Sequence, residues 1–389
     1  MSTQIVVLGS GYAGTGSVLS LEEHLDADAQ ITWVSDVDHH LVLHEAHRCI
    51  RDPSLRQKIT FPAADIAGRQ TEFLQARVEA VDQESQAVEL ESGEMLEYDY
   101  LVVGIGSQTA FFGIDGLEEH ALTLKSLEDA LSIHEAVKQA ARQASRSAPA
   151  RIVVGGAGLS GIQTAGEIAK FGEDNRAPLD ITLVEGLDEI FPNNDGVVQR
   201  KLRRLLEDED ITIETGEFIS AVDAESVYIG DDRELGYDVL IWTGGITGQE
   251  AAREVAVDQD DRSHRLEAAS TFQTSDEAIF ALGDAALIDQ QGESRAPPTA
   301  QAAWQAAEVI GENIDRSIRG EPLKTWVHDD KGTLVSVGDR AVAHGVVGVK
   351  SVVNTFGGVP AEMLKKTVAA RWINQVAGPA AAARAFPDM

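Results

Sequence analysis

Two glycine-rich segments have the residue types and the spacing that bind phosphate groups. They are Gly9-Ser10-Gly11-Tyr12-Ala13-Gly14 and Gly156-Ala157-Gly158-Leu159-Ser160-Gly161. In such a turn the first glycine permits a tight strand-to-helix connection, the second lets the backbone approach a pyrophosphate, and the third lets helix and strand pack closely. The N-terminus of the following helix offers N–H groups and a favourable dipole to the phosphates. Each segment therefore predicts a dinucleotide-binding turn.

The sequence around each turn supports that interpretation. Apolar runs at residues 5–8 and 152–154 precede the turns and predict strands. An acidic residue follows each turn at roughly the 20-residue spacing of the carboxylate that hydrogen-bonds a nucleotide ribose; these residues are Asp36 and Glu185. A single motif of this kind arises by chance in glycine-rich chains. Two copies in the right context predict two dinucleotides that meet, as an electron donor and a flavin would.

The rest of the chain predicts an α/β protein of two or three domains. It has 389 residues, in which strand-like and helix-like patterns alternate. This order predicts two Rossmann-like dinucleotide-binding domains followed by a small C-terminal α+β region. No apolar run approaches the roughly 20 residues that span a bilayer, and the N-terminus enters a strand directly, without a secretory signal. We therefore expect a cytoplasmic protein, or one attached peripherally to the cytoplasmic face of the cell membrane.

The net charge restricts partners and environment. Asp and Glu total 64 against 32 Lys and Arg, which gives a formal charge of −32. Such a surface repels nucleic acid, whose binding requires basic patches. It also repels itself until salt screens it, and at 1 M salt the screening length is about 3 Å. The composition favours a halophilic protein from a high-salt cytosol; the alternative is an ordinary acidic protein.

Cysteine content excludes one class of redox chemistry. Cys49 is the only cysteine, so no intrachain disulfide can form. Flavoproteins that reduce disulfides or oxidise sulfide need several cysteines. We expect Cys49 to be a small buried residue rather than a reactive thiol. The spacing of the histidines gives no case for a metal site.

Further elements are expected along the chain. Residues 98–107 predict a strand that enters the Gly106-Ser107 turn, and residues 78–96 predict a hairpin or meander. Ser126 and Thr299 are placed to begin helices. The remaining expectations are strands ending at Gly244-Gly245 and Gly283-Asp284, short strands after residue 324, a helix over residues 361–376 and a frayed helical tail at 380–384.

These features together resemble type II NADH dehydrogenases. The resemblance rests on the two glycine turns, on Gly106-Ser107 and Gly283-Asp284, and on the Ala-Gln-x-Ala-x-Gln pattern that contains Gln301 and Gln305. It covers nearly the whole chain. Members of that family are single-chain FAD proteins that pass electrons from NADH to a membrane quinone without pumping protons. The resemblance implies a three-layer, glutathione-reductase-like fold. It divides the chain into an FAD domain at 1–120 and 266–323, an NAD(H) domain at 121–265 and a C-terminal interface region at 324–389.

The resemblance also implies which residues hold FAD. The first glycine turn would cradle the pyrophosphate, together with the Gly106-Ser107 turn. Gly283 and Asp284 would contact the ribityl or phosphate region of FAD, although Asp284 could instead be a helix N-cap. The segment at residues 40–45, with His40, His44 and Glu45, matches one that runs beside the flavin; its histidines could instead be satisfied surface groups. The position of the family's ribose-binding acid falls on Ser35, with Asp36 one residue later, so either residue could bind the ribose.

For the second nucleotide, the resemblance places NADH on the second glycine turn and beside Gly244 and Gly245. Glu185 would hydrogen-bond the adenosine ribose and repel a 2′-phosphate, which favours NADH over NADPH. A nearby arginine could still permit NADPH.

Four positions correspond to the family's acceptor side, and the chain departs from the family at one of them, Gln163. Gln301 and Gln305 lie on one helical face and would line a quinone site; a solvated helix face is the alternative. Many relatives carry Glu where this chain has Gln163, and glutamine cannot carry a proton. Lys365 matches a lysine near flavin and quinone, where it would favour the anionic reduced flavin; it could instead be a surface lysine that snorkels.

The resulting hypothesis is an FAD-dependent NADH:quinone oxidoreductase. One alternative is a soluble flavoprotein reductase that serves an iron–sulfur protein partner. Another is a redox-responsive flavin- and NAD-binding protein. The predicted helix at residues 361–376, with its apolar and basic side chains, would either contact a membrane peripherally or pack against a second subunit in a homodimer.

Overall fold

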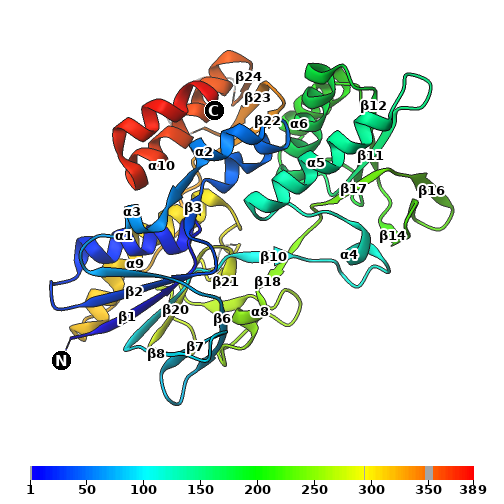
Figure 1. Cartoon of the computed structure of the whole chain (residues 1–389). Coiled ribbons are helices and arrows are strands. Elements are labelled where there is room, and N and C mark those ends of the chain that lie inside the picture. The colour runs from blue at the N-terminus through cyan, green and yellow to red at the C-terminus, as the bar shows by residue number, and fades with distance from the viewer. Residues whose placement is uncertain (1, 293, 347–353) are drawn as a thin grey trace. The chain divides into compact units, whose positions relative to one another are not determined.

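The computed structural model describes residues 2–292, 294–346 and 354–389. The chain divides into two compact units (Figure 1). Unit 1 comprises residues 1–42, 60–108 and 246–330, and unit 2 comprises residues 43–59, 109–245 and 331–389. Each unit is built on one parallel sheet, and in each sheet one strand leads directly into a glycine turn.

The parallel sheet of unit 1 has five strands in the order β20-β9-β1-β2-β5. The strands are β20 (Ile279–Ala281), β9 (Tyr100–Val103), β1 (Gln4–Leu8), β2 (Gln30–Ser35) and β5 (Thr71–Gln75). Helices α1 (Tyr12–His24) and α9 (Ala300–Ile318) lie side by side (Figure 1). Their backbones approach closely at Gly311, where an added Cβ would lie 2.2 Å from the carbonyl oxygen of Ser20.

Smaller elements complete unit 1. The predicted meander is confirmed as the antiparallel strands β6 (Val78–Asp82), β7 (Ala87–Leu90) and β8 (Met95–Glu97). Thr299 caps α9 by accepting a hydrogen bond from the backbone N–H of Ala302. The remaining elements are β3 (His39–Leu41), β4 (Thr60–Pro62), α3 (Ala63–Ile66), β18 (Ile246–Gly248), α8 (Glu250–Arg253), β19 (Leu266–Ala268), η3 (Gly283–Ala285) and β21 (Ala286–Ile288).

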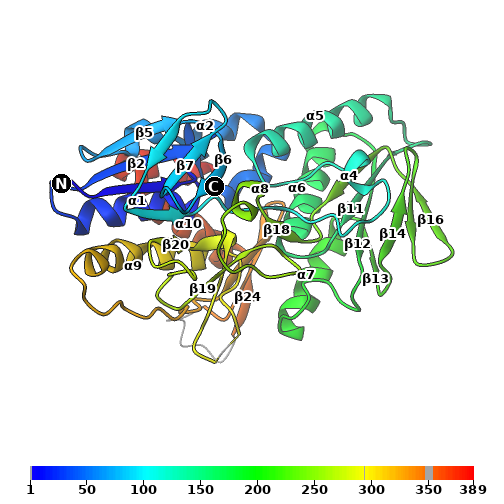
Figure 2. The same cartoon turned by 90° about the horizontal axis from the view of Figure 1, so that it is seen from below.

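The parallel sheet of unit 2 has four strands in the order β13-β12-β11-β17. They are β13 (Ile211–Thr215), β12 (Leu179–Glu185), β11 (Ala150–Gly155) and β17 (Val239–Trp242). Helices α5 (Leu127–Gln143) and α6 (Leu159–Asn175) contact β11, and α7 (Gly196–Asp208) contacts β13 (Figure 2). The predicted start of α5 is confirmed: Ser126 and Asp129 form a reciprocal capping box.

Additional short elements belong to unit 2. An antiparallel sheet consists of β14 (Ile219–Val222), β15 (Ser226–Ile229) and β16 (Arg233–Gly236). The others are η1 (Leu43–Ile50), η2 (Pro53–Leu55), α2 (Arg56–Ile59) and α4 (Leu117–His120). Strand β10 (Ser107–Thr109) runs across the division between the units in the sequence.

The C-terminal region consists of three antiparallel strands and a long helix. These are β22 (Thr333–Val337), β23 (Arg340–His344), β24 (Thr355–Gly357) and α10 (Val359–Ala385), followed by η4 (Phe386–Asp388). The predicted helix over residues 361–376 is therefore present and extends further. A non-helical Gly378, with φ of +80°, interrupts it just before Pro379.

The prediction of a frayed tail at residues 380–384 is wrong. Ala381, Ala382 and Ala385 are buried. The side chain of Arg48 donates a hydrogen bond to the carbonyl oxygen of Asp388 at 2.7 Å, and Lys366 donates to that of Pro387 at the same distance. The alanine-rich sequence indicated a helix but could not show that basic side chains elsewhere in the chain hold its end.

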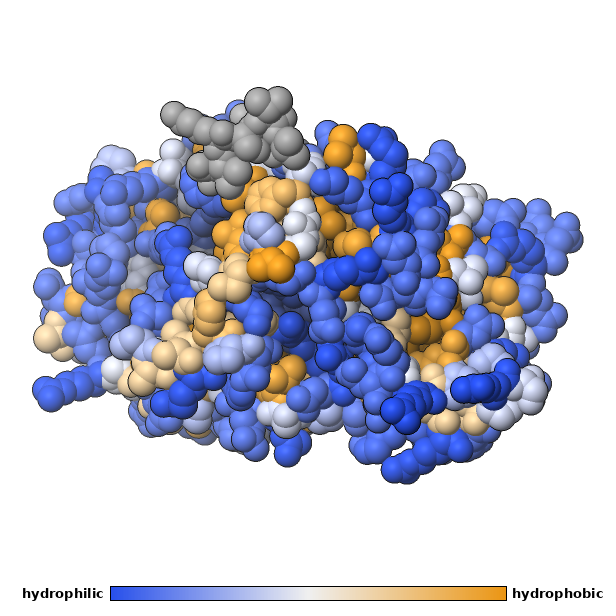
Figure 3. All heavy atoms as spheres, turned by 90° about the horizontal axis from the view of Figure 1, so that it is seen from above, coloured by the Kyte–Doolittle hydropathy of each residue, from blue (hydrophilic) through white to orange (hydrophobic). Residues whose placement is uncertain are grey.

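The observed architecture confirms the predicted fold class, with two Rossmann-like sheets and a small C-terminal α+β region. Most of the face drawn in Figure 3 is hydrophilic, as the acidic composition predicts. In the described part of the chain, no helix has the length and apolar character needed to cross a bilayer.

Candidate active site

The first glycine turn has the geometry that a phosphate-binding turn requires. Gly9 has φ of +97°, and a Cβ there would lie 2.5 Å from the carbonyl oxygen of Gly104. A Cβ on Gly14 would lie 1.8 Å from the carbonyl oxygen of Gly9. Gly11 differs, because its Cβ would meet nothing within 4 Å, and no side chain caps α1 at this position. Gly9 and Gly14 are thus needed for packing, whereas Gly11 leaves space at the helix N-terminus for a phosphate.

The second turn repeats this arrangement. Gly156 has φ of +89°, and its Cβ would lie 2.6 Å from the Cα of Gly244. A Cβ on Gly161 would lie 1.8 Å from the carbonyl oxygen of Gly156, and a Cβ on Gly158 would meet nothing within 4 Å. The close approach of Gly244 explains why a glycine follows β17. Both turns therefore fit a dinucleotide pyrophosphate.

The residues proposed to bind the ribose groups differ between the two turns. Glu185 is buried, and its carboxylate accepts hydrogen bonds from the backbone N–H groups of Ala157 at 2.8 Å and Leu187 at 3.1 Å. Ser35 is also buried, with its hydroxyl 2.9 Å from that of Ser10. Asp36 is more than half exposed and lies 3.8 Å from Arg77. The first turn thus has a hydroxyl at the place where the second has a carboxylate.

Asp284 and its neighbours lie close to the first turn. A Cβ on Gly283 would lie 2.7 Å from the Cβ of Ala13, and the Ser107 hydroxyl donates a hydrogen bond of 3.4 Å to the Asp284 carboxylate. Asp284 lies inside η3 and does not cap a helix with its side chain. The structure thus brings Gly283, Asp284 and Ser107 together in unit 1, and disfavours the N-cap alternative for Asp284. An added Cβ on Gly106 would meet nothing within 4 Å.

Two further residues support this turn. The buried Arg265 donates hydrogen bonds to the carbonyl oxygens of Asp284 at 2.8 Å and Ala286 at 2.6 Å. His40 is fully buried, with Nδ1 2.8 Å from the carbonyl oxygen of Ser10. His40 lies in the segment that the resemblance places beside the flavin, whereas Arg265 belongs to no motif and was missed by sequence reasoning.

Gln301 and Gln305 share one face of α9, and both are partly buried. The Gln305 amide donates to the carbonyl oxygen of Asp329 at 2.9 Å and accepts from the N–H of Asp329 at 3.1 Å. Its orientation is therefore held by backbone groups. The expectation that the pair lines a quinone site stays a prediction.

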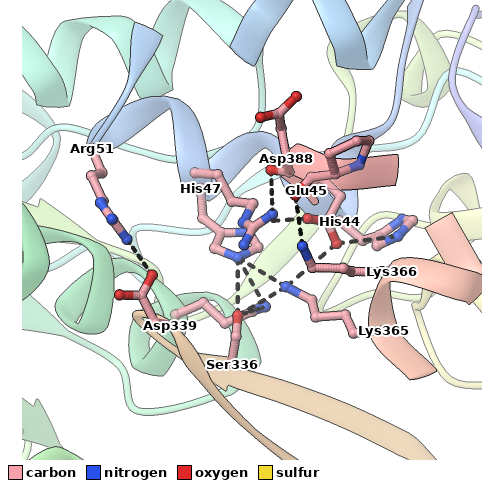
Figure 4. Close-up of polar contacts among 12 residues, drawn as sticks. His44, Glu45, His47, Arg51, Ser336, Asp339, Lys365, Lys366 and Asp388 are labelled. Carbon is pink, nitrogen blue, oxygen red and sulfur yellow. Dashed lines mark hydrogen bonds and ion pairs between the residues drawn. The ribbon is translucent and has the colours of Figure 1, made fainter. Parts of the chain in front are cut away.

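Lys365, His47 and Ser336 form a buried polar cluster in unit 2 (Figure 4). The buried Gln163 belongs to the same cluster. Lys365 Nζ lies 2.8 Å from Ser336 Oγ and 3.2 Å from His47 Nε2. Gln163 Nε2 lies 3.1 Å from Ser336 Oγ and 3.2 Å from His47 Nε2. Because Lys365 is only 8% exposed, the alternative of a snorkelling surface lysine is wrong.

Glu45 supplies the negative charge of this cluster. Its carboxylate lies 3.4 Å from Lys365 Nζ and 3.6 Å from both His44 Nε2 and Arg48 Nε. Burial by itself would raise the pKa of Glu45, but Lys365, His44 and Arg48 together hold it below its usual value. Glu45 is thus a buried carboxylate that three basic side chains keep ionised. His44 lies beside Glu45, and its predicted contact with FAD stays a prediction.

Burial acts on the basic members of the cluster by lowering their pKa values. Burial lowers the pKa of Lys365, and Glu45 partly offsets the effect. Burial and the charge of Lys365 hold the pKa of His47 well below its usual value, so His47 is neutral near pH 7. Glu45 lies in the segment at residues 40–45 that the resemblance places beside the flavin, but its role as a counter-charge was not predicted. Sequence reasoning missed His47 and Ser336, and only the position of His47, three residues after His44, could have suggested one of them.

No group of three or more His, Cys, Asp or Glu side chains within residues 2–292, 294–346 and 354–389 is arranged to hold a metal ion. Each unit has an open glycine turn, and unit 2 also contains the buried cluster of Lys365 and Glu45.

Comparisons with known proteins agree with this architecture. The chain is 27% identical over 394 residues to a type II NADH:quinone oxidoreductase of Staphylococcus aureus, covering 96% of each chain. Among solved structures, NDH2 from Plasmodium falciparum in complex with NADH has a TM-score of 0.86 at 17% identity, covering 100% of this chain and 98% of that one. The sulfide:quinone oxidoreductase of Aquifex aeolicus has a TM-score of 0.81 at 20% identity, covering 97% and 92%. These two likenesses show the fold.

A family profile extends the comparison from individual relatives to a whole family. The profile described as pyridine nucleotide-disulphide oxidoreductase matches residues 3–307, which include both glycine turns. The chain therefore belongs to the pyridine nucleotide-disulphide oxidoreductase family.

Proposed function

We propose that this chain is an FAD-dependent NADH:quinone oxidoreductase that does not pump protons. One observation carries the proposal: two glycine turns of the same geometry, each with an open middle glycine, occur in a chain that matches type II NADH:quinone oxidoreductases over 96% of its length. Bound FAD would supply the chemistry, taking a hydride from NADH and passing two electrons to the acceptor. The protein needs no nucleophile for this reaction; its groups bind, orient and set charge.

In this proposal the FAD domain consists of residues 1–120 and 266–323. The first glycine turn holds the pyrophosphate at Gly11, where the structure leaves room for it. Asp284 and Ser107, which are hydrogen-bonded to each other, bind the part of FAD nearest to Gly283. Ser35 binds the adenosine ribose, because its hydroxyl points at the turn whereas Asp36 points to solvent.

NADH binds to the domain at residues 121–265, with its pyrophosphate at Gly158. The buried carboxylate of Glu185 favours the ribose hydroxyls of NADH and disfavours the 2′-phosphate of NADPH. The chain carries a single cysteine, Cys49, and it is buried. Electrons therefore pass to the acceptor without a disulfide beside the flavin, which separates this protein from the disulfide-reducing members of its family.

A quinone is the proposed acceptor. Gln301 and Gln305 present amides from α9, and Lys365 supplies a cation whose charge favours a reduced, anionic acceptor or cofactor. Gln163 can hydrogen-bond but cannot carry a proton, so ionisable groups elsewhere must deliver the two protons that quinone reduction consumes.

Anaerobic titration of the purified protein tests the proposal. NADH should bleach the flavin absorption near 450 nm, a property of flavins at roughly that wavelength, and a quinone such as menadione should restore it. Failure to retain FAD would contradict the proposal. Recovery with a ferredoxin but not with menadione would favour the iron–sulfur reductase instead. Slow turnover with an oligomeric state that follows NADH would favour a redox-responsive binding protein.

The location of the protein also belongs to this proposal. Val359, Met363 and Val368 are exposed on α10, close in sequence to the basic residues Lys366 and Arg371. This surface supports peripheral contact with the cytoplasmic face of the membrane, as part of a respiratory chain, or contact with a second copy in a homodimer. The charge of −32 supports a cytoplasm of high salt concentration.

A further inference from the structure

The ammonium group of Lys365 is buried and needs a negative charge nearby. Burying an isolated charge is costly, and a buried lysine otherwise loses its proton. The neighbouring Gln163 is neutral and cannot stabilise the ammonium as a carboxylate would. Among the described residues, Glu45 is the only carboxylate within ion-pair distance of Lys365, at 3.4 Å.

The donors around His47 bear on which of its ring nitrogens carries a proton. A lysine ammonium has donors and no acceptor. Lys365 Nζ lies 3.2 Å from His47 Nε2, so a charged Lys365 requires that nitrogen to accept the hydrogen bond and to carry no proton. Gln163 Nε2 approaches the same nitrogen at 3.2 Å, which agrees with a neutral imidazole protonated on Nδ1. Lys365 Nζ thus lies within hydrogen-bond distance of a hydroxyl and an imidazole nitrogen, and within ion-pair distance of the Glu45 carboxylate (Figure 4).

Charged groups face Lys365 from two other elements. His44, Glu45, His47 and Arg48 lie on η1, and Glu167 lies on α6; β22 contributes the uncharged Ser336. Glu167 is only 2% exposed, and burial raises its pKa. The structure shows no ion pair of Glu167 within the described residues. Glu45, which three basic side chains hold ionised, is therefore the stronger counter-charge.

We infer that Glu45 is a positioning residue of the acceptor site: its carboxylate holds Lys365 as a charged ammonium, directed toward His47 and Ser336, in a cluster where position 163 provides no charge. The inference rests on the proposed function for the meaning of that charge in the reaction. Every group named here that contacts Lys365 lies in unit 2, and its charge state can be measured without quinone turnover.

The test is the titration of Lys365 in Glu45→Gln. The protein with 13C-labelled lysine is titrated by NMR, and the Lys365 resonance is identified by its loss in Lys365→Arg. An opposite charge at this distance shifts a pKa by roughly one to three units, so removal of the carboxylate should lower the titration midpoint of Lys365 by about that amount. If the quinone reductase rate requires a protonated Lys365, the rate should fall at high pH, and the midpoint of that fall should move down by the same interval. Glu135→Gln is the matched control, because Glu135 pairs with Lys138 on the surface and should leave both midpoints unchanged.

Placing a carboxylate at position 163 gives a second test of the inference. Glu45→Gln combined with Gln163→Glu should return the Lys365 midpoint to within about half a unit of the original, because opposite charges near each other favour ionisation. If Glu45→Gln does not fold, Glu45→Asp withdraws the carboxylate by one methylene and should lower the midpoint by about half a unit.

An unchanged Lys365 midpoint in Glu45→Gln, or in Glu45→Asp where only that variant folds, overturns the inference. Its failure is distinct from failure of the proposed function. A wild-type protein that does not reduce quinone contradicts the function and leaves the lysine titration intact. If the Lys365 midpoint is unchanged in Glu45→Gln and the enzyme still reduces quinone, the positioning role is wrong and the proposed function stands.

Discussion

Ser35 and Glu185 occupy the same structural position in the two parallel sheets. Each is the last residue of the second strand, after Val34 pairs with Leu8 in one sheet and Val184 pairs with Gly155 in the other. Each side chain reaches the second residue of its glycine turn. The Ser35 hydroxyl lies 2.9 Å from that of Ser10, and the Glu185 carboxylate accepts from the N–H of Ala157 at 2.8 Å.

The two residues differ in charge. Glu185 contacts its turn through a carboxylate, which in the proposed function faces the NADH ribose, whereas Ser35 contacts its turn through an uncharged hydroxyl. We therefore expect discrimination between nucleotides with and without a 2′-phosphate at the second turn.

Glu185→Arg should change the preference for NADH. The substitution removes a charge that repels a 2′-phosphate and adds one that attracts it, and unfavourable like-charge contacts cost several kcal/mol. We expect the ratio of kcat/KM for NADH to that for NADPH to fall by about tenfold or more, about 1.4 kcal/mol. Glu185→Gln is the control: it can still accept from the turn but lacks the charge, so its ratio should fall less. An unchanged ratio in Glu185→Arg would refute this role for Glu185.

Alanine substitutions at Gly11 and Gly14 should differ in their effect on the stability of the apoprotein. A Cβ on Gly14 overlaps the carbonyl oxygen of Gly9, and overpacking of this kind costs about 1–3 kcal/mol, so Gly14→Ala should lower the free energy of unfolding without FAD. A Cβ on Gly11 meets nothing, so Gly11→Ala should change that stability by less than about 0.5 kcal/mol.

FAD binding should respond differently from stability in this pair. Gly11→Ala should weaken FAD binding because its methyl group occupies the space left for the phosphate. Chemical denaturation of the apoprotein and fluorescence titration with FAD measure the two effects separately. If Gly11→Ala retained full FAD affinity, the phosphate would not approach at that glycine.

The Cys49 thiol should be inert in the folded protein. Burial, assisted by Asp52, raises the pKa of Cys49 to about 12, and the thiolate is the reactive form. Below that pH the thiol stays protonated and shielded. At pH 8 we expect no reaction with a thiol reagent until denaturant is added, and then one equivalent per chain. Cys49→Ala should keep at least about half of the quinone reductase rate, since a buried small residue is replaced by a smaller one. Loss of turnover in a folded Cys49→Ala protein would show that a thiol takes part.

Stability should rise with salt concentration. The chain carries a formal charge of −32, whose self-repulsion weakens as the screening length falls to about 3 Å at 1 M. We expect the thermal midpoint to increase by more than roughly 5 °C between dilute buffer and molar KCl. NaCl at the same ionic strength is the control and should act alike if screening is responsible. Equal midpoints in dilute buffer and molar KCl would count against a halophilic protein.

Much of the fold could be predicted because its signals are local. The glycine turns, the apolar strands before them and the capping residues Ser126 and Thr299 each act within a few residues. Steric limits on φ and unpaired N–H groups at helix ends depend on the nearest neighbours in the chain. The C-terminal tail shows the limit of this reasoning, since its end is held by Arg48 and Lys366.

The sequence by itself predicted two parallel α/β units with glycine turns between strand and helix, the lack of any intrachain disulfide and an acidic surface. The tertiary structure alone decided that Lys365 is buried, that Glu45 is its counter-charge, and that Ser35 rather than Asp36 faces the first turn. The physical reason is that burial and ion pairing depend on segments distant in sequence, such as His47 and Lys365, which are 318 residues apart and lie 3.2 Å from each other. Periodicity can suggest which face of a helix is buried, but it cannot identify the charged groups that will meet there.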